Sequence, residues 1–123
     1  MSEKPEVEFY DGPVPTELVI TDLVEGDGDE AVAGRDVSVH YVGVAHSTGE
    51  EFDASYNRGS AFRFPLGGGR VIAGWDQGVQ GMKVGGRRQL VIPSHLGYGD
   101  RGAGAVIKPG ETLIFVVDLL QVH

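Results

Sequence analysis

The sequence contains no cysteine among its 123 residues. This absence excludes a disulfide framework and any thiolate chemistry. A chain of this length can bury a hydrophobic core without disulfides or bound metals. We therefore expect one compact domain.

Long hydrophobic runs are also absent, because the longest continuous apolar run covers only residues 113–117. That run is far too short to span a membrane. The start of the chain, Met1–Glu6, lacks the basic and then apolar pattern of a secretory signal. We expect a soluble, cytoplasmic protein with no membrane partner.

Basic residues are scarce at the N-terminus, where residues 1–30 contain ten acidic residues and only Lys4 as a base. The net charge of that segment is −9. Because the net charge of the whole chain is −8, residues 31–123 are nearly neutral. This polarity argues against nucleic acid or an anionic membrane as a partner. We interpret residues 1–16 as an acidic, flexible leader that aids solubility, and residues 17–123 as the domain.

Motifs for covalent, metal or nucleotide chemistry are missing. Ser94-His95 lacks the G-x-S-x-G turn of a hydrolase, and Gly67–Arg70 lacks the Lys-Ser/Thr of a phosphate loop. The acids around Gly26–Asp29 do not have the spacing of an EF-hand loop. The histidines at 40, 46, 95 and 123 show no ligand spacing. We expect neither a metal nor a cofactor.

What the sequence has in abundance is glycine, at 20 residues, which predicts many tight turns. Between the turns, apolar residues alternate as they do in strands, for example at Val37, Val39 and Tyr41. Apolar residues on both faces of the last segment predict a central strand. Pro65 places its own segment at a sheet edge or a strand end. Strands are expected at residues 17–24, 36–43, 51–54, 62–66, 87–93 and 112–122.

Helical spacing occurs in one stretch, Val71–Val79, where Ile72, Trp75 and Val79 fall on one helix face. A helix this short is not stable alone in water and needs a surrounding structure. We therefore predict an α+β fold, an antiparallel half-barrel sheet wrapped around one short helix. Residues 94–109 have little periodicity and are interpreted as a functional flap.

Aromatic residues are dispersed along the chain, and most would be ordinary core. Two features point beyond a core: Asp53 follows Phe52 in an apolar neighbourhood, and Tyr98 lies in the expected flap. The surrounding motifs resemble those of the FKBP-type peptidyl-prolyl isomerases, the tacrolimus- and rapamycin-binding immunophilins. The resemblance extends over residues 34–122 and includes short bacterial members. It is carried in order by Val39–Gly43, Phe52–Ser55, Phe62–Gly67, Val71–Gly85, Leu96–Gly99 and Thr112–Phe115.

The resemblance implies a hydrophobic pocket between the helix and the sheet, with the prolyl ring on Trp75. The Ile72 backbone N–H and the Tyr98 hydroxyl would bond ligand carbonyls. Asp53 would be a buried polar group, held by Tyr41 and Arg58. The pocket walls would be Tyr41, Phe62, Val71, Ile72 and Phe115, with Phe52 and Ile107 at the rim.

The implied activity is rotation about X-Pro bonds in peptides and folding proteins, by non-covalent stabilisation of the twisted amide. Proline-containing segments of client proteins and macrolide ligands would be the partners, and the protein would act as a monomer without a cofactor. Lys108 stands where many eukaryotic members have a proline, which alters the expected flap surface.

Two rival interpretations keep the fold and change the function. One is a peptide-binding or chaperone surface without isomerisation, and the other is a transcription-factor domain. Retention of Phe62, Trp75 and Tyr98 together argues against both.

Overall fold

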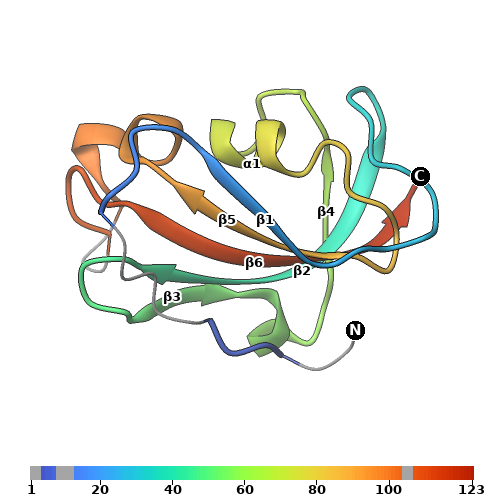
Figure 1. Ribbon diagram of the computed structural model, residues 1–123, viewed down its shortest axis with the longest axis horizontal. Coiled ribbons are helices and arrows are strands. Elements are labelled where there is room, and N and C mark those ends of the chain that lie inside the picture. The colour runs from blue at the N-terminus through green and yellow to red at the C-terminus, as the bar shows by residue number, and fades with distance from the viewer. Residues whose placement is uncertain (1–3, 8–12, 104–106) are drawn as a thin grey trace.

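The computed structural model describes residues 4–7, 13–103 and 107–123 (Figure 1). The elements in chain order are β1 (Val19–Val24), β2 (Asp36–Ala45), β3 (Glu51–Ala54), η1 (Ser55–Arg58), β4 (Phe62–Pro65), α1 (Ala73–Gly78), β5 (Arg87–Ile92), η2 (Ser94–Leu96), η3 (Gly99–Arg101) and β6 (Leu113–Val122). Three turns of 3-10 helix lie in two of the connections between the strands, one turn between β3 and β4 and two between β5 and β6.

The strands form one six-stranded antiparallel sheet in the order β1-β5-β6-β2-β3, and β4 also pairs with β2. Because β6 pairs along one edge of β2, β3 and β4 lie end to end along its other edge. Figure 1 shows α1 lying on one side of the twisted sheet. The predicted α+β fold, an antiparallel sheet around one short helix, is confirmed.

The last strand is central and buried on both faces, as predicted. Phe115 and Val117 belong to the main core beneath α1, together with Trp75. Ile114 belongs to a smaller cluster with Val44 and Val91. The edge positions are also as expected, since β4 pairs only with β2.

The described part of the acidic leader contacts the sheet. Val7 packs against the smaller cluster of Val44, Val91 and Ile114. The Lys4 ammonium lies 2.7 Å from Glu51 of β3. These contacts place residues 4–7 against the domain, and the leader's flexibility remains a prediction.

Helix α1 is shorter than predicted, because Ile72 is its N-cap and regular helix begins at Ala73. Trp75 and Val79 are buried as expected. The glycines of the helix explain how it approaches the sheet so closely. A Cβ atom at Gly74 would stand 2.6 Å from Ile92 Cγ2, well inside van der Waals contact. The sequence pattern therefore predicted that Trp75 and Val79 are buried, but it did not predict the close contact that Gly74 makes with Ile92.

Other element boundaries differ slightly from the prediction. β1 begins at Val19, two residues later than expected, and β2 continues past Gly43 to Ala45. The expected flap at 94–109 contains η2, η3 and a bridge between Ala103 and Ile107. Positions 104–106 of that flap lie outside the described residues. In the described part of the chain, no helix is long and apolar enough to cross a membrane.

Candidate active site

An aromatic cavity of about 460 Å³ opens between α1 and the sheet. Its walls come from β2, β3, β4, α1 and β6, from residues 69–72 directly before α1, and from Tyr98 between η2 and η3. Nine of the eleven residues predicted for the site line it, and Arg58 and Ile107 do not. The lining is Tyr41, Phe52, Asp53, Phe62, Gly69, Arg70, Val71, Ile72, Trp75, Tyr98 and Phe115.

Trp75 forms the centre of the aromatic lining. The Tyr41 ring packs edge-on at 4.8 Å between centroids, and the Phe115 ring packs edge-on at 5.2 Å. The indole is only 4% exposed, yet it borders the open cavity. Trp75 Nε1 meets no hydrogen-bond acceptor within the described ranges, because its neighbours are aromatic rings. The ring therefore offers an apolar surface held rigidly by other rings.

Polar contacts at the cavity link Tyr41, Asp53 and Arg58. The Tyr41 hydroxyl donates to Asp53 Oδ2 at 2.5 Å. Arg58 donates to Asp53 Oδ1 at 2.8 Å and to the Tyr41 oxygen at 2.9 Å. Burial, followed by the hydrogen bond to Asp53, raises the pKa of Tyr41 above its ordinary value. The hydroxyl therefore stays protonated at neutral pH.

The expectation that Asp53 is buried is wrong, because its side chain is 43% exposed. β3, which carries Asp53, is the last strand of the sheet path and pairs only with β2. The predicted contacts of Asp53 with Tyr41 and Arg58 are present in spite of this exposure. The ion pair with Arg58 is itself exposed to solvent, so it fixes the position of the carboxylate more than it stabilises the fold.

Hydrogen-bond donors at the cavity are free in two places. The Ile72 N–H meets no acceptor within residues 4–7, 13–103 and 107–123, while the Ile72 carbonyl accepts from Trp75 N at 2.9 Å. Tyr98, between η2 and η3, is 40% exposed. Burial raises the pKa of Tyr98, so its hydroxyl remains a donor. Both groups can bind a carbonyl oxygen that enters the cavity.

The remaining predicted residue, Ile107, is in the main core and not at the cavity rim. It is 5% exposed, and its backbone pairs with Ala103 at 2.8 and 3.2 Å. This pairing holds Ile107 beside Ala103. Conversely, Gly69 and Arg70 line the cavity and were not predicted, although they directly precede Val71 in the sequence. The Gly-rich run carries no local pattern that predicts its position beside the cavity, because that position depends on how the chain folds before α1.

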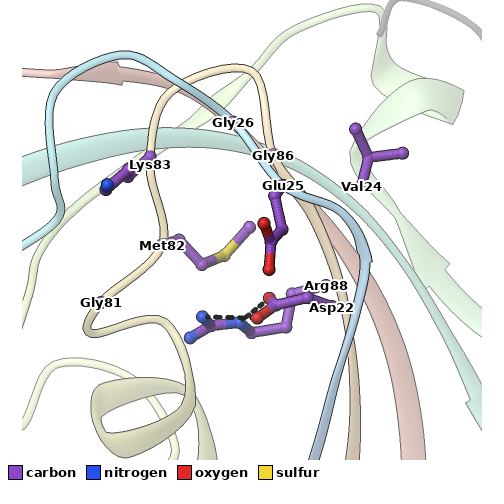
Figure 2. Close-up of a pocket in the computed structure, with 9 residues that line it drawn as sticks. All are labelled: Asp22, Val24, Glu25, Gly26, Gly81, Met82, Lys83, Gly86 and Arg88. Carbon is purple, nitrogen blue, oxygen red and sulfur yellow. Dashed lines mark hydrogen bonds and ion pairs between the residues drawn. The ribbon is translucent and has the colours of Figure 1, made fainter.

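A second, smaller hollow of about 190 Å³ lies between β1 and the turn after α1 (Figure 2). Arg88 lines this hollow, and its Nε donates a hydrogen bond to Asp22 Oδ1 at 2.6 Å. The same guanidinium binds the carbonyls of Gly78 at 2.8 Å and Gln80 at 3.0 Å. The hydrogen bonds of Arg88 thus connect β5 to β1 and to the end of α1. No cluster of three metal-binding side chains occurs in the described residues.

Comparison with known proteins identifies the family. A family model described as FKBP-type peptidyl-prolyl cis-trans isomerase matches residues 28–120. An FK506-binding protein of Streptomyces anulatus is 69% identical, over 98% of this chain and 98% of its own. A probable FK506-binding protein of Corynebacterium glutamicum is 53% identical, over 97% of this chain and 98% of its own.

A solved structure gives the same family. The crystal structure of AtFKBP13 superposes with a TM-score of 0.80 at 43% identity, over 89% of this chain and 96% of that chain. Fold, sequence and the aromatic cavity agree, and this chain belongs to the FKBP-type peptidyl-prolyl cis-trans isomerases.

Proposed function

We propose that the aromatic cavity is where an X-Pro amide binds and rotates, with the prolyl ring on the face of Trp75. The observation that carries this proposal is an open apolar cavity that has two unpaired donors, the Ile72 N–H and the Tyr98 hydroxyl. The walls in this proposal are Tyr41, Phe62, Val71, Ile72 and Phe115, and Phe52, which belongs to the edge strand β3, is at the rim.

The chemistry requires no nucleophile. Rotation about the amide has a barrier of about 18–20 kcal/mol because twisting destroys resonance. Uncatalysed exchange at X-Pro bonds takes roughly tens of seconds or longer. The twisted amide is less dipolar than the planar one, so an apolar pocket disfavours the planar ground state relative to the twisted state. Fixed donors add to this preference, and both effects are differential binding.

The polar residues have supporting roles in this proposal. Asp53 accepts a hydroxyl or N–H of the bound ligand, and Arg58 balances its charge from 2.8 Å. The N–H of Ile72 and the hydroxyl of Tyr98 bind ligand carbonyls on either side of the proline. Ile107 supports the flap from the core and does not touch the ligand, in keeping with its 5% exposure.

The same cavity is proposed to bind the macrolides tacrolimus (FK506) and rapamycin. Support comes from the names of the relatives from Streptomyces anulatus and Corynebacterium glutamicum, both FK506-binding proteins. A rigid macrocycle with a proline-like ring would use the same aromatic base and the same carbonyl contacts as the peptide.

The test is the rate of cis/trans exchange of a Leu-Pro or Phe-Pro peptide, measured with protein alone and with added tacrolimus. Acceleration that tacrolimus abolishes supports catalysis in this cavity. Peptide binding without acceleration would favour the chaperone interpretation. Acceleration that tacrolimus leaves intact would place catalysis elsewhere.

We further propose that the protein works as a cytoplasmic monomer on proline-containing segments of folding client proteins, with no nucleic-acid or membrane partner. The exclusion of nucleic acid and of an anionic membrane rests on the acidic N-terminal segment, which negatively charged partners would repel. Light scattering at micromolar concentration tests the monomer, and cell fractionation tests the location.

A further inference from the structure

Arg70 is the charged residue on the cavity wall whose charge is not balanced. The only other charged lining residue, Asp53, is paired with Arg58 at 2.8 Å. Arg70 is exposed, and no hydrogen bond or ion pair joins its side chain to any other described residue. Because the Asp53–Arg58 pair is neutral as a unit, the lining of the cavity has a net positive charge at Arg70.

The backbone that carries Arg70 is held in place. The Asp76 carboxylate in the first turn of α1 accepts hydrogen bonds from Gly67 N at 2.8 Å and Gly69 N at 3.0 Å. Both glycines have left-handed φ values, +79° and +71°, which other residues rarely adopt. The Arg70 side chain therefore projects from a fixed backbone beside Val71, while the side chain itself stays free to meet a ligand.

We propose that Arg70 is a specificity determinant, which favours proline segments bearing a carboxylate side chain next to the proline. A guanidinium forms two parallel hydrogen bonds with a carboxylate, a geometry that a neutral side chain does not offer. A lysine at the same peptide position would be repelled by the same charge. The inference rests on the proposed use of the cavity for peptide binding.

The test uses peptides that differ only in the residue next to proline, with Glu, Gln or Lys placed before it in one set and after it in another. We expect the wild-type kcat/KM to be about two- to fivefold higher for Glu than for Lys in at least one set, the range of an exposed ion pair. Raising the salt from about 0.05 M to about 0.5 M should shrink the ratio, because salt screens exposed charges.

Arg70→Gln should bring the Glu-to-Lys ratio close to one, and Arg70→Glu should invert it. Lys83→Gln is the matched control, since it removes one positive charge from the wall of the other hollow (Figure 2). That variant should keep the wild-type ratio, because its charge is not at the aromatic cavity.

A Glu-to-Lys ratio that is the same in Arg70→Gln and wild type would overturn the inference, as would a wild-type ratio of one in both peptide sets. Failure of the proposed function looks different. In that case none of the peptides would be accelerated, or the acceleration of all of them would persist with tacrolimus bound.

Discussion

The Tyr41 hydroxyl donates a 2.5 Å hydrogen bond to Asp53, and Arg58 contacts both groups, at 2.9 and 2.8 Å. Tyr41 is on β2, Asp53 on β3 and Arg58 in η1, so the three contacts fasten the hairpin and the following turn at the cavity. This arrangement gives the cavity wall a fixed polar side next to its aromatic base.

Tyr41→Phe should lower kcat/KM for a proline peptide by about two- to tenfold, the cost of losing one hydrogen bond of roughly 0.5–1.5 kcal/mol. Without the hydroxyl, Asp53 and Arg58 lose the group that fixes them against β2. Tyr56→Phe is the matched control, since it removes the hydroxyl that binds Asp118 outside the cavity. Equal losses in the two variants would show that the effect is not local to the cavity.

Turnover should be nearly constant between about pH 6 and pH 8, because the rate step requires no proton transfer. The raised pKa values of Tyr41 and Tyr98 keep both hydroxyls protonated over that range. A bell-shaped pH profile of kcat/KM would contradict the mechanism.

The raised pKa of Tyr41 also predicts how the stability of the fold changes at alkaline pH. For Tyr41 the folded-state pKa lies above the unfolded-state value, so its contribution is fully present below about pH 10. That contribution is lost as the pH rises through the higher folded value. The unfolding free energy, measured from neutral pH upward, should therefore begin to fall near pH 10, and the onset should be weaker in Tyr41→Phe.

Tyr98→Phe should weaken tacrolimus binding by about 0.5–1.5 kcal/mol, because it removes one donor to the ligand. The hydroxyl has no partner in the described residues, so its loss should leave the folded state almost unchanged. Calorimetric titration gives the affinity, and thermal unfolding provides the check on stability. Unchanged affinity would remove Tyr98 from the site.

Asp118→Asn should destabilise the fold by about 3 kcal/mol, because it breaks a buried ion pair. Asp118 is 0% exposed and accepts from Arg87 Nε at 2.6 Å and from Tyr56. Asp36→Asn is the contrasting variant, since its pair with Arg63 is exposed on both sides and is worth about 0.2–1 kcal/mol. Denaturant unfolding measures both, and similar losses would refute the role given to burial.

Gly74→Ala should destabilise the protein by about 1–3 kcal/mol and lower activity, because overpacking would force α1 away from the sheet. The new methyl group would stand 2.6 Å from Ile92 Cγ2 and move the neighbouring Trp75. Gln77→Ala, at an exposed position of the same helix, should change stability by less than about 0.5 kcal/mol. If Gly74→Ala were stabilising, alanine's helix propensity would outweigh the contact.

The strand pattern could be predicted because alternation of apolar residues is a local property of the chain. Residues 113–119 of β6 are apolar on both faces except at Asp118, and this predicted a central strand correctly. The short helix was also predicted from the spacing of Trp75 and Val79. In contrast, Gly74 gave no local sign that it faces Ile92, since that contact joins distant parts of the chain.

The cavity residues were predicted mainly through the family motifs, and errors arose where a motif does not specify exposure. Asp53 was expected to be buried and is half exposed, because only the sheet order places β3 at an edge. Ile107 was expected at the rim and lies in the core. The position of Arg70 on the wall was not predicted, because no motif specifies it; Gly67 and Gly69, which bond to Asp76, hold the backbone just before it.

The sequence by itself determined the strands, the one short helix and the set of aromatic residues. The spacing of apolar residues and the family motifs can both be recognised in short stretches of consecutive residues. Only the tertiary structure decided which charges are balanced and which donors stay free at the cavity. Asp53 pairs with Arg58, whereas Arg70 has no partner among the described residues, and the physical reason is distance. Electrostatic and hydrogen-bond energies depend on separations and burial that exist only once the sheet has closed around α1.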